Sequence, residues 1–288
     1  MNVRVADLLR QFDLERLEVN LFRGESRDIG SPQVYGGQVL GQALMAAYHT
    51  IEELEVHSLH AYFLRRGDFS RPIVYQVDRS RDGHSFSSRR VIAVQNGEQI
   101  FTCAASFQRR EQGLDHQSTM PEVPAPESLP DWSRPSAEVA ARLPDLLQRM
   151  LTRERPIEFR PVAPIDFLDR RPGPPIERVW FRIAEPLSDD DRLHRALLAY
   201  MSDFNLLMAA TRPHEGSYAL GEMTMASIDH ALWFHRPFRA DEWLLYDIDS
   251  PSASGARGFS RGSVYRRDGR LVASVAQEGL IRVRRQRN

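Results

Sequence analysis

The sequence predicts an α+β protein made of two similar halves, each a curved antiparallel sheet wrapped around one central helix. Three observations support this fold class. Short motifs recur in the same order in both halves, hairpin turns fall at matching places, and each half holds one almost wholly apolar segment of helical length. Repetition on this scale is typical of a duplicated structural unit.

The repeat is carried by pairs of short segments. His60-Ala61 in the first half matches His230-Ala231 in the second. Asn96-Gly97 and Asp268-Gly269 each separate two apolar-rich runs, and such a dipeptide with such flanks is a strong hairpin signal. The runs around these motifs predict strands at 57–65, 72–79, 86–95 and 98–108, and again at 224–236, 242–249, 257–267 and 270–283.

The two halves are separated by a change in composition. Residues 111–135 are rich in proline and fit no regular element, so they predict a linker that crosses the surface. This gives an N-terminal domain over 1–110 and a C-terminal domain over 136–288. The C-terminal domain is expected to begin with a helix near 136–152 and a strand near 157–162.

Two segments are candidates for the central helices, 36–50 and 191–211. Between residues 196 and 210 the only polar side chains are Ser202, Asp203 and Asn205. A helix that is apolar on nearly every side must be enclosed by protein. A strongly curved antiparallel sheet around such a helix is the hot-dog arrangement, and the duplication then predicts a tandem, or double, hot-dog.

Asp203 is the unusual residue of the second helix. Helical spacing places it on one face with Tyr200 and Leu207. A carboxylate there is costly unless hydrogen-bond donors reach it. Physical chemistry alone leaves two readings open: a base that works near neutral pH, or a group that only pins a neighbouring strand.

Bulk composition excludes several classes of protein. Hydrophobic residues make up 42% and charged residues 27% of the 288 residues, and the formal net charge of -1 gives no reason to expect a nucleic-acid partner. The single cysteine, Cys103, cannot form an internal disulfide. No apolar run reaches the roughly 18 residues of a membrane span. We therefore expect a cytoplasmic protein.

The sequence does not support several other kinds of site. His57 with His60, and His230 with His235, stand at odd spacings that place the two members of each pair on opposite faces of a strand. With no cysteine or acidic partner nearby, we expect no metal site. The sequence also lacks a Gly-x-Ser-x-Gly elbow, which argues against a serine α/β-hydrolase, and it has no Walker loop and no dinucleotide fingerprint.

Five separated segments, in the right order, resemble the type II acyl-CoA thioesterases, the TesB-like family. They are Val34-Tyr35-Gly36-Gly37-Gln38, Arg81-Asp82-Gly83-His84-Ser85-Phe86, Tyr200-Met201-Ser202-Asp203-Phe204, the run 228–238 and the run 273–279. The resemblance covers nearly the whole chain. It implies a double hot-dog that hydrolyses fatty acyl-CoA thioesters to free fatty acid and CoA, without cofactor or metal.

The resemblance also implies a catalytic set. The family's helix aspartate matches Asp203, its strand hydroxyl matches Ser227, and its last-strand glutamine matches Gln277. Together these groups would direct a water molecule at the thioester carbonyl. We further expect backbone N–H groups of the segment Gly36, Gly37 and Gln38 to bind substrate by stabilising the oxyanion, unless these glycines serve only to let helices pack closely.

Two rival functions stay open at this point. A hot-dog enoyl-CoA hydratase would need an Asp–His pair, and His84 after Asp82 is the nearest imitation. A non-catalytic acyl-CoA-binding protein would need none of the three catalytic-type residues. Because hot-dog sheets have free edges, we also expect a homodimer or homotetramer.

Overall fold

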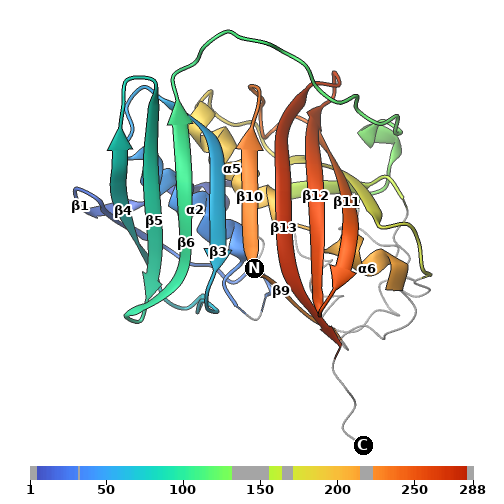
Figure 1. The fold of residues 1–288 in the computed structure, drawn as a ribbon, viewed down its shortest axis with the longest axis horizontal. Helices are drawn as coiled ribbons and strands as arrows, with labels where there is room; N and C mark the ends of the chain where they lie inside the picture. The colour runs from blue at the N-terminus through green and yellow to red at the C-terminus, as the bar shows by residue number, and fades with distance from the viewer. Residues whose placement is uncertain (1–4, 32, 132–155, 164–170, 215–222, 284–288) are drawn as a thin grey trace, which may run out of the picture.

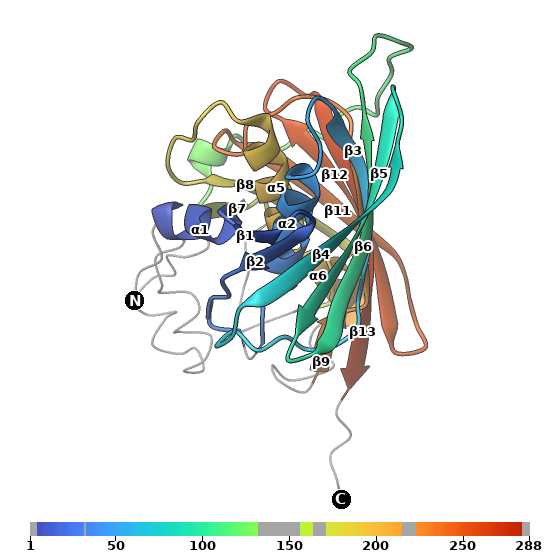
Figure 2. The same ribbon diagram turned by 90° about the vertical axis from the view of Figure 1, so that its left-hand side faces the viewer.

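One continuous antiparallel sheet forms the body of the molecule. The computed structural model describes residues 5–31, 33–131, 156–163, 171–214 and 223–283. Within these ranges thirteen strands pair in the order β1-β2-β4-β5-β6-β3-β10-β13-β12-β11-β8-β7, and β9 pairs with β13 (Figure 1). The sheet curves, and the helices lie on one side of it (Figure 2). This is the expected double hot-dog.

The first half contains α1 (Val5–Phe12), β1 (Glu15–Glu18), β2 (Leu21–Gly24), α2 (Gly36–Tyr48), β3 (Glu55–Phe63), β4 (Ile73–Asp82), β5 (Phe86–Gln95) and β6 (Glu98–Gln108). The second contains η1 (Pro126–Ser128), β7 (Ile157–Pro161), β8 (Ile176–Ile183), α5 (Asp191–Ser202), α6 (Met208–Thr211), η2 (Arg212–His214), β9 (Met223–Ser227), β10 (Asp229–Phe234), β11 (Leu244–Ser254), β12 (Arg257–Arg266) and β13 (Leu271–Val283). The sequence reasoning missed α1, β1, β2 and β8. The helix expected near 136–152 lies outside the described residues.

The two halves join edge to edge through β3 and β10. In this antiparallel ladder His60 lies opposite Ala231, and Ala61 lies opposite His230. Directly opposed residues share a face of the sheet. As a result His60 is exposed on the outer face, whereas His230 is 1% exposed on the inner face. The two histidines that matched in the sequence repeat are therefore not equivalent in space.

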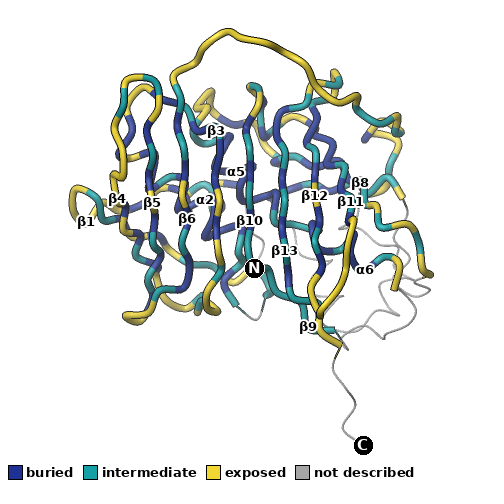
Figure 3. The backbone as a smooth tube through the Cα atoms, viewed as in Figure 1, coloured by how far each residue is buried: buried dark blue, intermediate teal, exposed yellow. Residues whose placement is uncertain are grey.

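The central helices α2 and α5 pack against each other in the hollow of the sheet, where most of the buried residues lie (Figure 3). Glycine allows this approach. A β-carbon on Gly37 would lie 2.2 Å from the carbonyl oxygen of Tyr200, and one on Gly41 would lie 2.9 Å from that of Ala196. The contacts run in opposite directions along the two helices, so the first turn of α2 lies against the last turn of α5.

The prediction of one continuous helix over 191–211 is wrong, because the segment forms two separate helices. Helix α5 ends at Ser202, Asp203 is its C-cap, and Asn205 takes a left-handed conformation with φ of 62° before α6 begins at Met208. Asparagine tolerates that conformation better than most residues. Asp203 and Leu207 therefore do not share a helical face. The predicted strand 224–236 is likewise divided, into β9 and β10.

Residues 109–125 form no helix or strand and cross from β6 to the second half (Figure 1). Their far end is anchored there, since the indole N–H of Trp180 donates to the carbonyl of Pro124 at 3.0 Å. Met120 and Val123 pack on the cluster around Trp180 and Trp243. In the described part of the chain, no helix is both long and apolar enough to cross a membrane.

Candidate active site

Asp203 lies where the last turn of α5 meets the first turn of α2. Its side chain is 5% exposed, and three donors reach the carboxylate. The Ser227 hydroxyl donates to Oδ1 at 3.1 Å, the Gln277 amide donates to the same oxygen at 2.6 Å, and the backbone N–H of Gly37 also donates. The three side chains singled out in the sequence thus meet at one point, from the C-cap of α5, from β9 and from β13.

The break between β9 and β10 sets this geometry. Ser227 is the last residue of β9 and lies opposite Gly279 on β13, two residues beyond Gln277. The carboxylate of Asp229 accepts a hydrogen bond of 2.6 Å from the backbone N–H of Glu278. This bond ties the start of β10 to β13 beside the site, so that Ser227 and Gln277 converge.

The electrostatics of Asp203 suit a base. Burial raises the pKa of its carboxyl group to about 6, while the hydrogen bonds from Gln277, Ser227 and Gly37 act in the opposite direction. The carboxylate is therefore mostly ionised at pH 7 and still basic enough to accept a proton. A freely solvated aspartate would be a far weaker base.

Sequence reasoning missed two residues of the site, His230 and Ser202. The buried ring of His230 places Nδ1 3.3 Å from Nε2 of Gln277 and Nε2 2.9 Å from Oγ of Ser202. Burial lowers the pKa of His230 to about 3, so the ring is neutral at pH 7. Its Nδ1 stands 4.0 Å from Oδ1 of Asp203, which is too long for a hydrogen bond. The pairing of an inward histidine with the serine next to Asp203 depends on the register of β10, which the sequence does not reveal.

The three backbone donors expected at the start of α2 differ in their partners. The N–H of Gly37 is used by Asp203, and that of Gln38 donates to the carbonyl of Tyr35 at 3.1 Å. The N–H of Gly36 has no partner within the described chain. The Gln38 side chain turns to the backbone of Glu25 and Arg27 instead. Of the segment, Gly36 alone has an N–H that is free for a ligand.

A cavity of about 200 Å³ adjoins the site. Gly36 and Ser227 form part of its lining, and a β-carbon on Gly36 would lie 2.7 Å from Oδ2 of Asp203. The Asp203 carboxylate therefore lies next to Gly36, a residue that lines the cavity. The rest of the lining mixes apolar side chains with three polar or charged ones, Gln33, Arg65 and Arg66. Its other members are Val34, Val39, Phe63, Leu64, Gly67, Ile100, Phe101 and Ala226.

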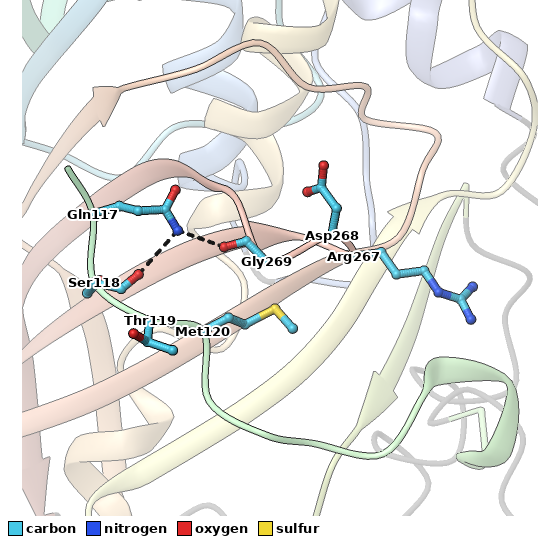
Figure 4. A pocket seen from close by; sticks show the side chains of 7 residues that line it. All are labelled: Gln117, Ser118, Thr119, Met120, Arg267, Asp268 and Gly269. Atoms are coloured by element: carbon cyan, nitrogen blue, oxygen red, sulfur yellow. Dashed lines mark hydrogen bonds between the residues drawn. The ribbon is translucent and has the colours of Figure 1, made fainter. Parts of the chain in front are cut away.

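A larger cavity, of about 410 Å³, has none of these features. It lies between residues 117–120 and the turn that joins β12 to β13 (Figure 4). The Gln117 amide is already bonded to the carbonyl of Gly269 and the N–H of Leu271, and Arg267 pairs with Glu127. The polar groups around it serve to fasten the linker, so the smaller cavity is the candidate site.

The rival catalytic groups do not form a site. Asp82 is bonded to the buried guanidinium of Arg89, and His84 is exposed. The Asp–His pair of a hydratase is therefore not assembled here. In the parts of the chain that the structure describes, no group of three or more His, Cys, Asp or Glu side chains could hold a metal ion.

The expectation that His57 and His60 point to opposite faces is wrong. A β-bulge between Val56 and Ser58 turns His57 outward, where its Nε2 lies 2.8 Å from Oγ of Ser106. The bulge adds one residue to β3 and so cancels the alternation that the spacing implied.

The curved sheet around two antiparallel helices defines the chain as a double hot-dog protein. Solved structures support this class: a hot-dog protein from Alicyclobacillus acidocaldarius, 19% identical, superposes with a TM-score of 0.74 over 95% of this chain and 97% of its own. TesB2, an acyl-CoA thioesterase II from Mycobacterium marinum, is 44% identical, with a TM-score of 0.79 over 95% of this chain and 97% of its own.

Sequence comparisons are more specific. Residues 151–280 match the acyl-CoA thioesterase family model, and residues 23–108 match that of the acyl-CoA thioesterase N-terminal domain. Human acyl-coenzyme A thioesterase 8 is 42% identical over 95% of this chain and 88% of its own length. Acyl-CoA thioesterase 2 of Haemophilus influenzae is 41% identical over 96% of this chain and 97% of its own length. The chain belongs to the TesB-like acyl-CoA thioesterase family and is a thioester hydrolase.

Proposed function

We propose that this enzyme hydrolyses fatty acyl-CoA to free fatty acid and CoA, with a water molecule activated by Asp203, Ser227 and Gln277. The observation that carries the proposal is the meeting of a hydroxyl and an amide on one buried carboxylate whose pKa is raised to about 6. A thioester carbonyl is a good electrophile and needs only a well-placed nucleophile.

In the proposed reaction the oxygen of the water attacks the carbonyl carbon while Asp203 accepts a proton from that water. The Ser227 hydroxyl and the Gln277 amide hold the carboxylate in place. The Oε1 atom of Gln277 is buried and has no partner in the described chain, so it offers the water an acceptor. The tetrahedral intermediate then collapses, the C–S bond breaks, and the leaving sulfur of CoA takes up the proton that Asp203 had accepted, which returns Asp203 to its ionised form.

The oxyanion would be stabilised by the backbone N–H of Gly36. This group is the first donor of α2, at the positive end of the helix dipole, and Gly36 lines the cavity. Loss of one such donor costs about 3–4 kcal/mol in other enzymes. The apolar side chains in the cavity lining, among them Phe63, Leu64 and Ile100, suit a fatty acyl chain.

The test is the variant Asp203→Asn, assayed for release of the CoA thiol from a series of acyl-CoA chain lengths. We expect kcat to fall by at least about a thousandfold while the fold is retained, since the amide cannot accept the proton. Wild-type turnover by the purified variant would refute the assignment. Crotonyl-CoA serves as the control for hydration: loss of its double bond without thiol release would indicate a hydratase.

A further inference from the structure

His230 and Ser202 form a chain of hydrogen bonds that ends on the Gln277 amide. The Ser202 hydroxyl donates to the carbonyl of Ala199 at 3.0 Å. It has only one hydrogen, so toward His230 Nε2, 2.9 Å away, it is an acceptor. The proton of the neutral ring must therefore be on Nε2, and Nδ1 carries a lone pair.

That lone pair has one suitable donor. Nε2 of Gln277 lies 3.3 Å from Nδ1 and carries two hydrogens, of which one goes to Asp203 and the other to His230. If the amide were turned over, its oxygen would face the Nδ1 lone pair and the Asp203 carboxylate, and both contacts would become repulsive. The ring thus fixes which end of the amide faces the carboxylate.

We propose that His230, held by Ser202, is a positioning residue that locks the Gln277 amide with its nitrogen on Asp203 and its oxygen toward the nucleophilic water. This inference rests on the proposed function. Burial of the three side chains supports it: His230 and Gln277 are each 1% exposed and Ser202 is 0% exposed, so bulk solvent does not compete for the hydrogen bonds between them. Strand β11 also holds Ser202 in place, because the Tyr246 hydroxyl donates to the carbonyl of Ser202 at 2.9 Å.

The first test replaces the ring. His230→Leu removes the acceptor at Nδ1, and we expect kcat to fall about 10- to 100-fold with KM changed less than about threefold, by analogy with the loss of one oriented catalytic contact. His230→Asn can place its side-chain oxygen near the position of Nδ1 and should keep kcat within about threefold of wild type. Equal losses in the two variants would overturn the inference.

The second test asks whether His230 acts through Gln277. In a Gln277→Ala background the His230→Leu change should leave kcat within about twofold, because no amide remains to be oriented. A further loss as large as in the wild-type background would mean a structural role and would refute the inference. If Gln277→Ala itself turns over at the wild-type rate, it is the proposed function that fails.

Should His230→Leu not fold, Ser202→Ala gives the same decision with less change in packing. It frees the ring to move its proton to Nδ1, so kcat should fall, and this fall should again vanish in the Gln277→Ala background. A readout independent of activity is the tautomer: ¹⁵N-histidine NMR should show His230 in the Nε2–H form between pH 5 and 8, assigned by its absence in His230→Asn. An Nδ1–H form would overturn the inference.

Discussion

A β-carbon on Gly36 would lie 2.7 Å from Oδ2 of Asp203 and 3.0 Å from the Phe63 ring, although Gly36 and Asp203 belong to different halves of the chain. The backbone of α2 thus comes into direct contact with the carboxylate of α5. Only glycine leaves room for both the carboxylate and a ligand at this point.

Gly36→Ala should therefore reduce activity without harming the fold. Any loss of stability should be small, because the atoms in the way are the ends of the Asp203 and Phe63 side chains and not backbone. The new methyl group must displace the Asp203 carboxylate or the Phe63 ring, and we expect kcat/KM to fall at least about a hundredfold. Thiol-release kinetics and thermal unfolding measure the two effects separately.

Gly113→Ala is the matched control, because a β-carbon there meets nothing within 4 Å. It should leave both kinetics and thermal stability at wild-type values. Full activity in Gly36→Ala would contradict the close contact with Asp203.

Gly37→Ala should mainly reduce the stability of the fold, in contrast to Gly36→Ala, which should mainly reduce activity. Its β-carbon would lie 2.2 Å from the backbone carbonyl of Tyr200, which cannot rotate away, so α2 and α5 must separate. Overpacking of this kind costs about 1–3 kcal/mol or more. Chemical denaturation should show the loss, and an unfolding midpoint equal to that of wild type would show that the helices tolerate the methyl group.

The pH profile should report Asp203. Because the base must be ionised, kcat/KM should fall as the pH drops through about 6, the pKa to which burial raises this carboxyl. His230 stays neutral over this range, since burial lowers its pKa to about 3, and should add no second step. Following the ultraviolet absorbance of the thioester avoids thiol reagents that fail in acid. A profile flat from pH 5 to 8 would exclude Asp203 as the base.

The raised pKa also has a cost in stability. The folded protein holds the Asp203 proton more tightly than the unfolded chain, so ionisation destabilises the fold fully above about pH 6 and not at all below the ordinary value of 3.8. With about 1.4 kcal/mol for each unit of pKa, the penalty is on the order of 3 kcal/mol. Asp203→Asn, relative to wild type, should gain more stability at pH 7.5 than at pH 4.5. Equal differences in melting temperature at the two pH values would argue against the raised pKa.

How far the sequence predicts this protein depends on the range of each signal. Asn96-Gly97 and Asp268-Gly269 mark hairpins whose strands follow within a few residues, so the ladders β5–β6 and β12–β13 were predicted almost to the residue. The end of α5 was not, because Asn205 and its left-handed turn stand in an apolar run that reads as continuous helix.

The residues of the site also differ in how far the sequence alone predicts them. Asp203 is conspicuous as a carboxylate in an apolar helix, whereas the roles of Ser227 and Gln277 came from the resemblance to a family. In the sequence, His230 stands out as part of the repeat and as a metal ligand that its spacing argues against, with no sign of a place in the active site. Its inward orientation follows from the pairing of β10 with both β3 and β13, and register between distant strands leaves no local trace in a sequence.

The join between β3 and β10 makes the covalent link between the halves dispensable once the chain has folded. Residues 109–118 are exposed, so a protease such as trypsin could cut after Arg109 or Arg110. The two fragments would remain associated through the hydrogen-bonded pairing of β3 with β10 and through the packing of α2 against α5. Such a nicked enzyme should stay assembled and active, and the two pieces, produced separately, should complement each other.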